Sequence, residues 1–120
     1  MGKRKVLVGL YIFFILWMTL FSREVATVRV FKGLFWEAKN HLWHFIVLNI
    51  LLFIPLGFLL RSITDSWKTI VCGFLLSVLI ELTQYWFRLG SCELDDVLNN
   101  TIGTVLGVGV WKLLTLLTEK

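Results

Sequence analysis

Four long apolar runs restrict the folds that this chain can adopt. They cover residues 6–21, 42–60, 69–87 and 97–117, which is 75 of the 120 residues. A helix that crosses a bilayer needs about 20 predominantly apolar residues, with a tolerance of about 17–25. The runs therefore predict an all-α polytopic membrane protein with four transmembrane helices, in a single domain over residues 1–120.

The composition excludes the usual soluble classes. Hydrophobic residues make up 58% of the chain and charged residues only 17%, whereas soluble domains average about 25% charged residues. The net charge of +4 would suit a nucleic-acid partner, but the basic residues flank the apolar runs and form no continuous basic face. We therefore expect a membrane protein without a nucleic-acid partner.

The basic residues also predict the orientation. Four spans place both termini on one side of the membrane, and the cluster Lys3-Arg4-Lys5 precedes the first run. Because Lys and Arg are enriched on the cytoplasmic side, we expect both termini in the cytoplasm. The residues after Phe21 lack a small-x-small cleavage pattern, so we expect the first run to be retained as a span.

Polar residues recur on one face of the third run. Ser77, Glu81, Gln84 and Arg88 are separated by steps of four, three and four residues. At about 100° per residue they form one stripe on a helix. An ionisable side chain inside a bilayer costs several kcal/mol unless it pairs or meets water, so Glu81 is informative.

The fourth run begins with a matching stripe. Asp96, Asn99, Asn100, Gly103 and Gly107 also fall on one helical face. A short loop joins the two runs, so the stripes of these antiparallel helices are expected to meet. We predict a polar pocket between the third and fourth helices, open to the outer face of the membrane.

These residue types allow several roles. Arg88 is suited to hold an anionic group, while Glu81, Asp95 and Asp96 are suited to act as acids, bases or metal ligands. Each also has a purely structural role available. The stripes can serve as contacts between helices, Arg88 can extend to the interface, and one aspartate can cap the fourth helix.

A metal site is not expected. His41 and His44 lie at the start of the second run, on the same membrane side as Asp95 and Asp96. Histidines beside Trp43 at a headgroup boundary are more often simply interfacial. We therefore predict neither a metal nor a cofactor.

The second run contributes one polar residue, Asn49, six residues before Pro55. Proline in a helix frees a carbonyl and bends the axis, and the freed groups need partners. We expect Asn49 to turn toward the third helix and to join the network around Glu81.

Three stretches together resemble the VanZ-like family. They are NILLFIPLGFLL at 49–60, SVLIELTQ at 77–84 with Arg88, and DDVLNNTIG at 95–103. The resemblance implies a protein of the bacterial inner membrane, in a family named for a member linked to resistance to the glycopeptide teicoplanin. The resemblance also implies a set of candidate functional positions, which are Asn49, Glu81, Gln84, Arg88, Asp96, Asn99 and Gly103.

Three functional hypotheses follow. The first is an envelope protein that contributes to teicoplanin resistance by binding a membrane lipid or lipid-linked envelope component at the outer face, through Asn49, Gln84, Arg88, Asp95, Asn99 and Asn100. The alternative is an intramembrane enzyme on a lipid-linked substrate, with Glu81 and Asp96 as acid and base. The third is a structural subunit whose stripes only join helices. A homo-oligomer is compatible with all three.

Overall fold

The computed structural model describes residues 2–21, 25, 28, 30–89 and 91–119. Its four helices long and apolar enough to cross a membrane are Gly2–Phe21, Trp43–Arg61, Ser66–Phe87 and Leu94–Thr118. The prediction of an all-α chain with four spans is therefore confirmed. The observed helices start up to four residues from the predicted boundaries, because polar and charged residues beside the apolar runs also adopt helical geometry.

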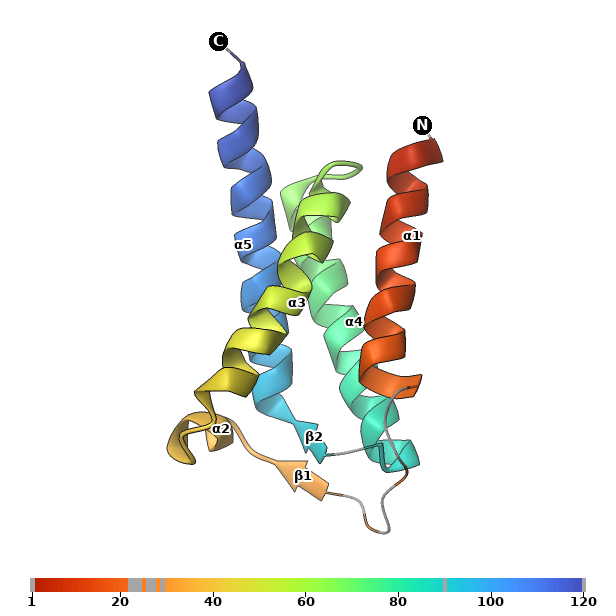
Figure 1. Ribbon diagram of the computed structural model, residues 1–120, viewed down its shortest axis with the longest axis vertical. Helices are drawn as coiled ribbons and strands as arrows, with labels where there is room; N and C mark the ends of the chain where they lie inside the picture. The colour runs from red at the N-terminus through yellow and green to blue at the C-terminus, as the bar shows by residue number, and fades with distance from the viewer. Residues whose placement is uncertain (1, 22–24, 26–27, 29, 90, 120) are drawn as a thin grey trace.

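Both chain ends lie at the same end of the helix bundle (Figure 1). The first span consists of α1 (Gly2–Leu16) and a π-helical turn, η1 (Trp17–Phe21). It packs against α3 (Trp43–Arg61), and the Tyr11 hydroxyl donates a hydrogen bond to the carbonyl of Leu52. The fully buried Ile15 of α1 joins an apolar core with Phe53, Leu56 and Ile80.

Glycines bring α3, α4 (Ser66–Phe87) and α5 (Leu94–Thr118) into close contact around Thr104. A Cβ atom on Gly57 or Gly73 would lie within 3.0 Å of Thr104, and one on Gly103 or Gly107 within 3.0 Å of a backbone oxygen of α3. Small residues allow such backbone approach in membrane proteins, where packing supplies much of the attraction between helices. We call these four glycines and Thr104 the glycine seam.

The end of the bundle opposite the termini carries elements that the apolar pattern did not predict (Figure 1). A short helix, α2 (Trp36–Lys39), and two strands, β1 (Val30–Lys32) and β2 (Ser91–Glu93), form there. The strands pair in parallel, with Phe31 opposite Cys92 and Lys32 opposite Glu93. This pairing joins the long first loop to the short loop between α4 and α5, and we call this region the capped end.

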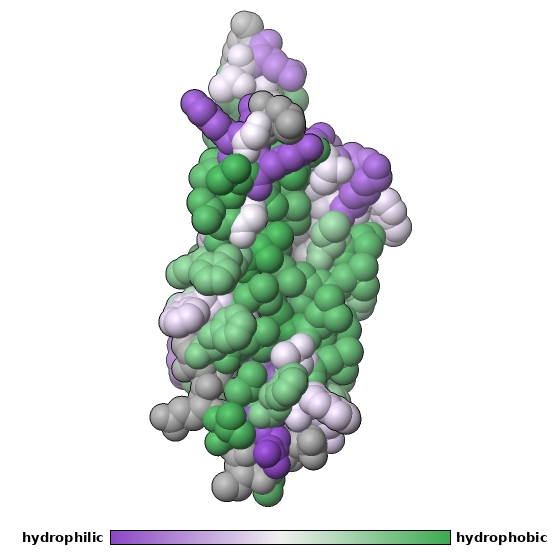
Figure 2. Space-filling model, turned by 90° about the vertical axis from the view of Figure 1, so that its right-hand side faces the viewer, coloured by the Kyte–Doolittle hydropathy of each residue, from purple (hydrophilic) through white to green (hydrophobic). Residues whose placement is uncertain are grey.

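The distribution of polar and apolar residues on the surface suits a protein that crosses a bilayer. Figure 2 shows hydrophobic residues around the middle of the bundle and hydrophilic ones gathered mainly near the chain ends. Large apolar side chains such as Leu10 and Leu79 are 61% exposed in the isolated chain. Contiguous exposed apolar surface of this extent is typical of a membrane-spanning segment and not of a soluble monomer.

Candidate functional site

The polar stripes of α4 and α5 meet, as their spacing predicts. Asn100 Nδ2 donates a hydrogen bond to Ser77 Oγ at 2.8 Å, and Ser77 Oγ lies 3.5 Å from the backbone oxygen of Asp96. Nearer the capped end, Glu81 Oε1 accepts a hydrogen bond of 2.9 Å from the backbone N–H of Glu93. The side chains of Ser77, Glu81 and Asn100 are all buried, so these contacts form the interior of the α4–α5 interface.

Five acidic side chains gather at the capped end. We call them the carboxylate cluster: Glu37, Glu81, Glu93, Asp95 and Asp96. Carboxyl oxygens of Glu37, Glu93 and Asp96 lie within 4.8 Å of one another. Burial, followed by the charges of Glu93, Asp96 and Asp95, raises the pKa of Glu37 to about 8. Glu37 is therefore mostly protonated at neutral pH, and a cation held by these three residues would have to displace that proton.

The same surroundings act on Cys92, which lies on β2 within this region. Burial raises the pKa of the Cys92 thiol, and the charges of Glu81, Asp96 and Glu93 raise it further. A thiol with a raised pKa is a poor nucleophile, because the thiolate is the reactive form. Cys92 lines the site beside the acidic residues, in the thiol form that these surroundings favour.

Asp95 does not cap α5, contrary to the structural role considered above. The helix begins at Leu94, and its N-cap residue Glu93 makes no side-chain capping bond. The buried Asp95 carboxylate instead accepts hydrogen bonds from the backbone N–H groups of Phe35 and Glu37. The start of α2 supplies these donors, so Asp95 fastens the first loop to α5.

Asn49 also reaches a different partner from the one expected. Its Nδ2 donates a hydrogen bond of 2.9 Å to Asp96 Oδ1, on α5 and not on α4. The reason is the glycine seam, which brings the backbone of α3 closest to α5. Asn49 thus joins the carboxylate cluster through Asp96.

Gln84 and Arg88 lie away from the α4–α5 contact. Gln84 is 1% exposed, and its Nε2 donates a hydrogen bond of 2.8 Å to the carbonyl of Thr19 in the π-helical turn. That turn ends a helix and leaves carbonyls without intrahelical donors, which explains the contact. Arg88 ends α4 with a left-handed backbone, φ 58°, and its buried Nε has no hydrogen-bond partner among the described residues.

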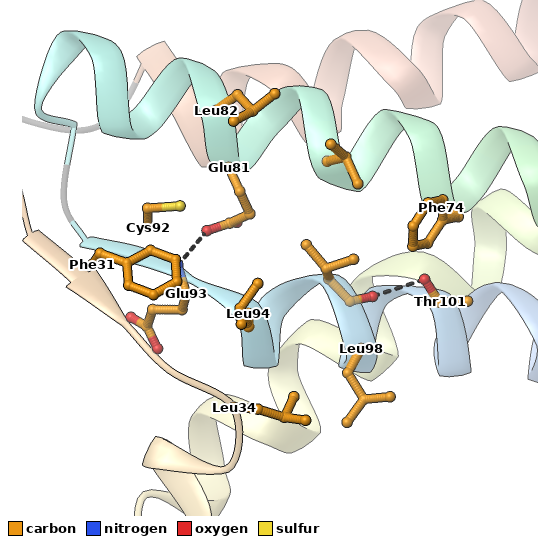
Figure 3. A pocket seen from close by; sticks show the side chains of 12 residues that line it. Phe31, Leu34, Phe74, Glu81, Leu82, Cys92, Glu93, Leu94, Leu98 and Thr101 are labelled. Carbon is orange, nitrogen blue, oxygen red and sulfur yellow. Dashed lines mark hydrogen bonds between the residues drawn. The ribbon is translucent and has the colours of Figure 1, made fainter.

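A cavity of about 480 Å³ lies between α4 and α5 (Figure 3). Its walls are largely apolar, and the residues that line it are Phe31, Leu34, Phe74, Val78, Glu81, Leu82, Cys92, Glu93, Leu94, Val97, Leu98 and Thr101. The prediction of a polar pocket is therefore wrong in its chemistry. The polar side chains of the two stripes form hydrogen bonds across the α4–α5 interface. The apolar side chains beside the stripes therefore line the cavity, and Glu81 and Glu93 lie at its capped end.

A second cavity, of about 270 Å³, lies beside α3 at the capped end. Phe35, Trp43, Ile46, Asp95, Leu98 and Asn99 line it, and Leu98 also lines the first cavity. Two of the predicted ligand-binding residues, Asp95 and Asn99, therefore face this space. Asn49, Gln84, Arg88 and Asn100 line neither cavity.

The apolar pattern missed the contribution of the loops. Glu37, Cys92 and Glu93 lie outside the four runs and belong to no periodic pattern. The strand pairing brings Cys92 and Glu93 to the site, and the hydrogen bond to Asp95 brings Glu37 there. Aromatic residues in the first loop, Phe31 and Phe35, were the available signal, since both line cavities.

Comparison with known proteins covers nearly the whole chain. The family model described as VanZ/LLP1 matches residues 8–115. Protein VanZ of Enterococcus faecium is 30% identical, over 94% of this chain and 77% of the relative. No solved structure matches the chain. The matched range contains all four long apolar runs, except the first two residues of the first and the last two of the fourth, and it contains every predicted site residue.

Proposed function

Because the chain belongs to the VanZ/LLP1 family, we propose that it is a multi-pass protein of the bacterial cell membrane that binds a membrane lipid or a lipid-linked envelope component. Binding would take place at the outer face and contribute to resistance to glycopeptides such as teicoplanin. This is the context that the family resemblance implies.

The cavity between α4 and α5 is the observation that carries the proposal. Its volume of about 480 Å³ lies in the usual range for ligand sites, about 300–1,000 Å³. Its apolar length suits a hydrocarbon chain, and its one polar end, at Glu81 and Glu93, suits the head of an amphiphile. Several lining side chains remain more than a third exposed, among them Phe74 and Leu82, so a lipid can enter from the side.

The proposed orientation follows from the positive charges. Lys3, Arg4 and Lys5 lie at the end of the bundle that holds both termini, where Arg4 also donates a hydrogen bond of 3.2 Å to the carbonyl of Ser62. With this end in the cytoplasm, the acidic capped end faces outward. A site there would meet envelope lipids on the side where glycopeptides act.

A complementation experiment tests the proposal. A bacterium lacking the gene would receive wild type, Thr101→Phe or Leu113→Phe, and teicoplanin susceptibility and membrane abundance would be measured together. Thr101→Phe fills the cavity, whereas Leu113→Phe adds the same ring to an exposed site of α5. We expect wild type and Leu113→Phe to protect and Thr101→Phe to fail at equal abundance. Protection by Thr101→Phe would contradict the proposal.

Glu81→Gln and Asp96→Asn separate the remaining hypotheses. Glu81→Gln keeps an oxygen that can accept the N–H of Glu93, so it removes charge with little change of contact. Loss of protection at equal abundance would mean that the carboxylates act in binding or in chemistry. Turnover of a lipid-linked substrate by wild type, lost in either variant, would favour the enzyme. A parallel loss of abundance would favour a purely structural role.

A further inference from the structure

The Nδ2 atom of Asn99 is buried, and none of the described residues accepts a hydrogen bond from it. Asn99 is 5% exposed and faces the second cavity, and its Nδ2 has no hydrogen-bond partner in the described part of the chain. The neighbouring amide nitrogens differ from it, because Asn49 Nδ2 bonds Asp96 and Asn100 Nδ2 bonds Ser77. Buried polar groups in native proteins are nearly always paired, so an unpaired one that faces a cavity indicates a group that binds there.

The other walls of the second cavity restrict the chemistry of that group. Phe35, Trp43 and Ile46 are apolar. The carboxylate of Asp95 already accepts two backbone N–H groups, from Phe35 and Glu37, so it has its partners without a cation. These walls favour a compact, neutral group that is apolar on its sides.

We propose that the second cavity binds a neutral secondary amide of the ligand, paired with the carboxamide of Asn99. The unpaired Nδ2 of Asn99 is a donor, so it calls for an acceptor, which the carbonyl oxygen of an amide supplies. In this proposal one amphiphile places its chain in the first cavity and its amide in the second, past Leu98, which lines both. The inference rests on the proposed function, since it assigns the head of the same ligand.

A matched pair of amphiphiles tests this inference. The full chain in lipid nanodiscs would be titrated calorimetrically with the dodecyl glycoside of N-acetylglucosamine and with dodecyl glucoside, which has a hydroxyl in place of the acetamido group. We expect wild type to bind the acetamido compound about tenfold more tightly, which is a typical effect of one well-made buried hydrogen bond. In Asn99→Leu this preference should disappear.

Cavity-filling variants separate this inference from the proposed function. Thr101→Phe should weaken both compounds equally and keep the acetamido preference, while Leu113→Phe should change neither. If Thr101→Phe weakens both compounds but wild type shows no preference, the amide inference is overturned and the proposed function stands. If Thr101→Phe affects neither compound, the proposed function fails.

The melting temperature of Asn99→Leu provides a second criterion. Replacement of an unpaired buried amide by an apolar side chain of similar size is neutral or stabilising. We therefore expect the variant to melt at or above the wild-type temperature while it loses the preference. A lower melting temperature, or failure to fold, would show that Asn99 supports the fold and would overturn the inference.

Discussion

The glycine seam and the carboxylate cluster share helices α4 and α5 but are built in opposite ways. At the seam, α3 and α5 touch through their backbones, and the Thr104 hydroxyl donates to the carbonyl of Asn100 at 3.0 Å. At the cluster, acidic groups crowd together, and buried atoms such as Glu37 Oε1 have no hydrogen-bond partner in the described structure. One region is optimised for contact, and the other keeps unfavourable interactions.

This difference separates the part that stabilises the fold from the part that is available for function. Close packing is favourable in a bilayer without any ligand. Like charges at short range and unpaired buried polar atoms are unfavourable, and natural proteins retain them mostly at functional sites. The capped end is thus held in place by the bundle beneath it, and substitutions in the two regions should have different consequences.

The largest expected effect comes from disrupting the seam. The three atoms nearest to a Cβ on Gly107 would all be backbone atoms of α3, which cannot move aside as a side chain can. We expect Gly107→Ala to lower the free energy of unfolding by about 3 kcal/mol, the upper range for overpacking. Gly109→Ala is the matched control on the same helix, because nothing lies within 4 Å of its Cβ. Denaturation in micelles measures both, and equal stabilities would contradict the close contact.

Asp95→Ala should disrupt the capped end and leave the bundle intact. The substitution leaves the N–H groups of Phe35 and Glu37 without their acceptor, at a cost of about 2 kcal/mol. Hydrogen exchange should then increase over residues 35–39 and remain unchanged in α3. Asp95→Asn keeps one acceptor oxygen and should have an intermediate effect. Faster exchange throughout α3 would mean that the two regions are not separable.

The four helices were predictable because each apolar run is long enough to cross a bilayer by itself. The contact of α4 with α5 was also predictable, since the spacing of Ser77 and Glu81 fixes one face of a helix and a short loop fixes the neighbour. Both depend on local periodicity, which is present in the sequence of each segment.

The capped end depends on pairing between distant segments, which local periodicity does not encode. Phe31 and Cys92 are 61 positions apart and become neighbours only through β1 and β2. Gln84 turned to Thr19 because of a π-helical turn that the apolar pattern of the first run does not reveal. The cavities follow from these contacts, so their lining was not predictable either.

The stability of the protein should depend on pH because of Glu37 in the carboxylate cluster. In the unfolded chain Glu37 ionises near its ordinary pKa of 4.5, but in the folded chain its pKa is about 8. Between these values the folded state retains a proton that the unfolded state releases, so stability falls as the pH rises. We expect the melting temperature to drop by about 5 °C from pH 5 to 8. Glu37→Gln should flatten this profile, and an unchanged slope in the variant would contradict the assignment.

The contact between the stripes should contribute less. Ser77→Ala, Asn100→Ala and the double variant form a thermodynamic cycle for the hydrogen bond of 2.8 Å between α4 and α5. Such bonds within membranes contribute about 0.6 kcal/mol on average. We expect a coupling energy of this size from reversible unfolding. A value near zero would mean that other contacts, the seam among them, join these helices.

The smallest expected effect on stability concerns Arg88, at the end of α4. Arg88 has φ 58° in a C-terminal motif in which Leu89 N–H bonds the carbonyl of Gln84 and Arg88 N–H that of Tyr85. Glycine is favoured at this position, because it adopts left-handed geometry without a Cβ penalty. Arg88→Gly removes the strain of a left-handed backbone at a residue with a Cβ, but glycine also has more conformational entropy in the unfolded chain. The second effect offsets part of the first, so we expect the free energy of unfolding to rise by about 0.5 kcal/mol.

Arg88→Ala removes the same guanidinium but keeps the Cβ, so it should give no such gain. If the guanidinium takes part in binding, both variants lose teicoplanin protection, although only one of them is more stable than wild type. If both variants protect fully, Arg88 has only a structural role. The candidate binding residues are then those of the two cavities and the carboxylates beside them. The two substitutions together therefore show whether the end of α4 contributes to binding or only to the stability of the fold.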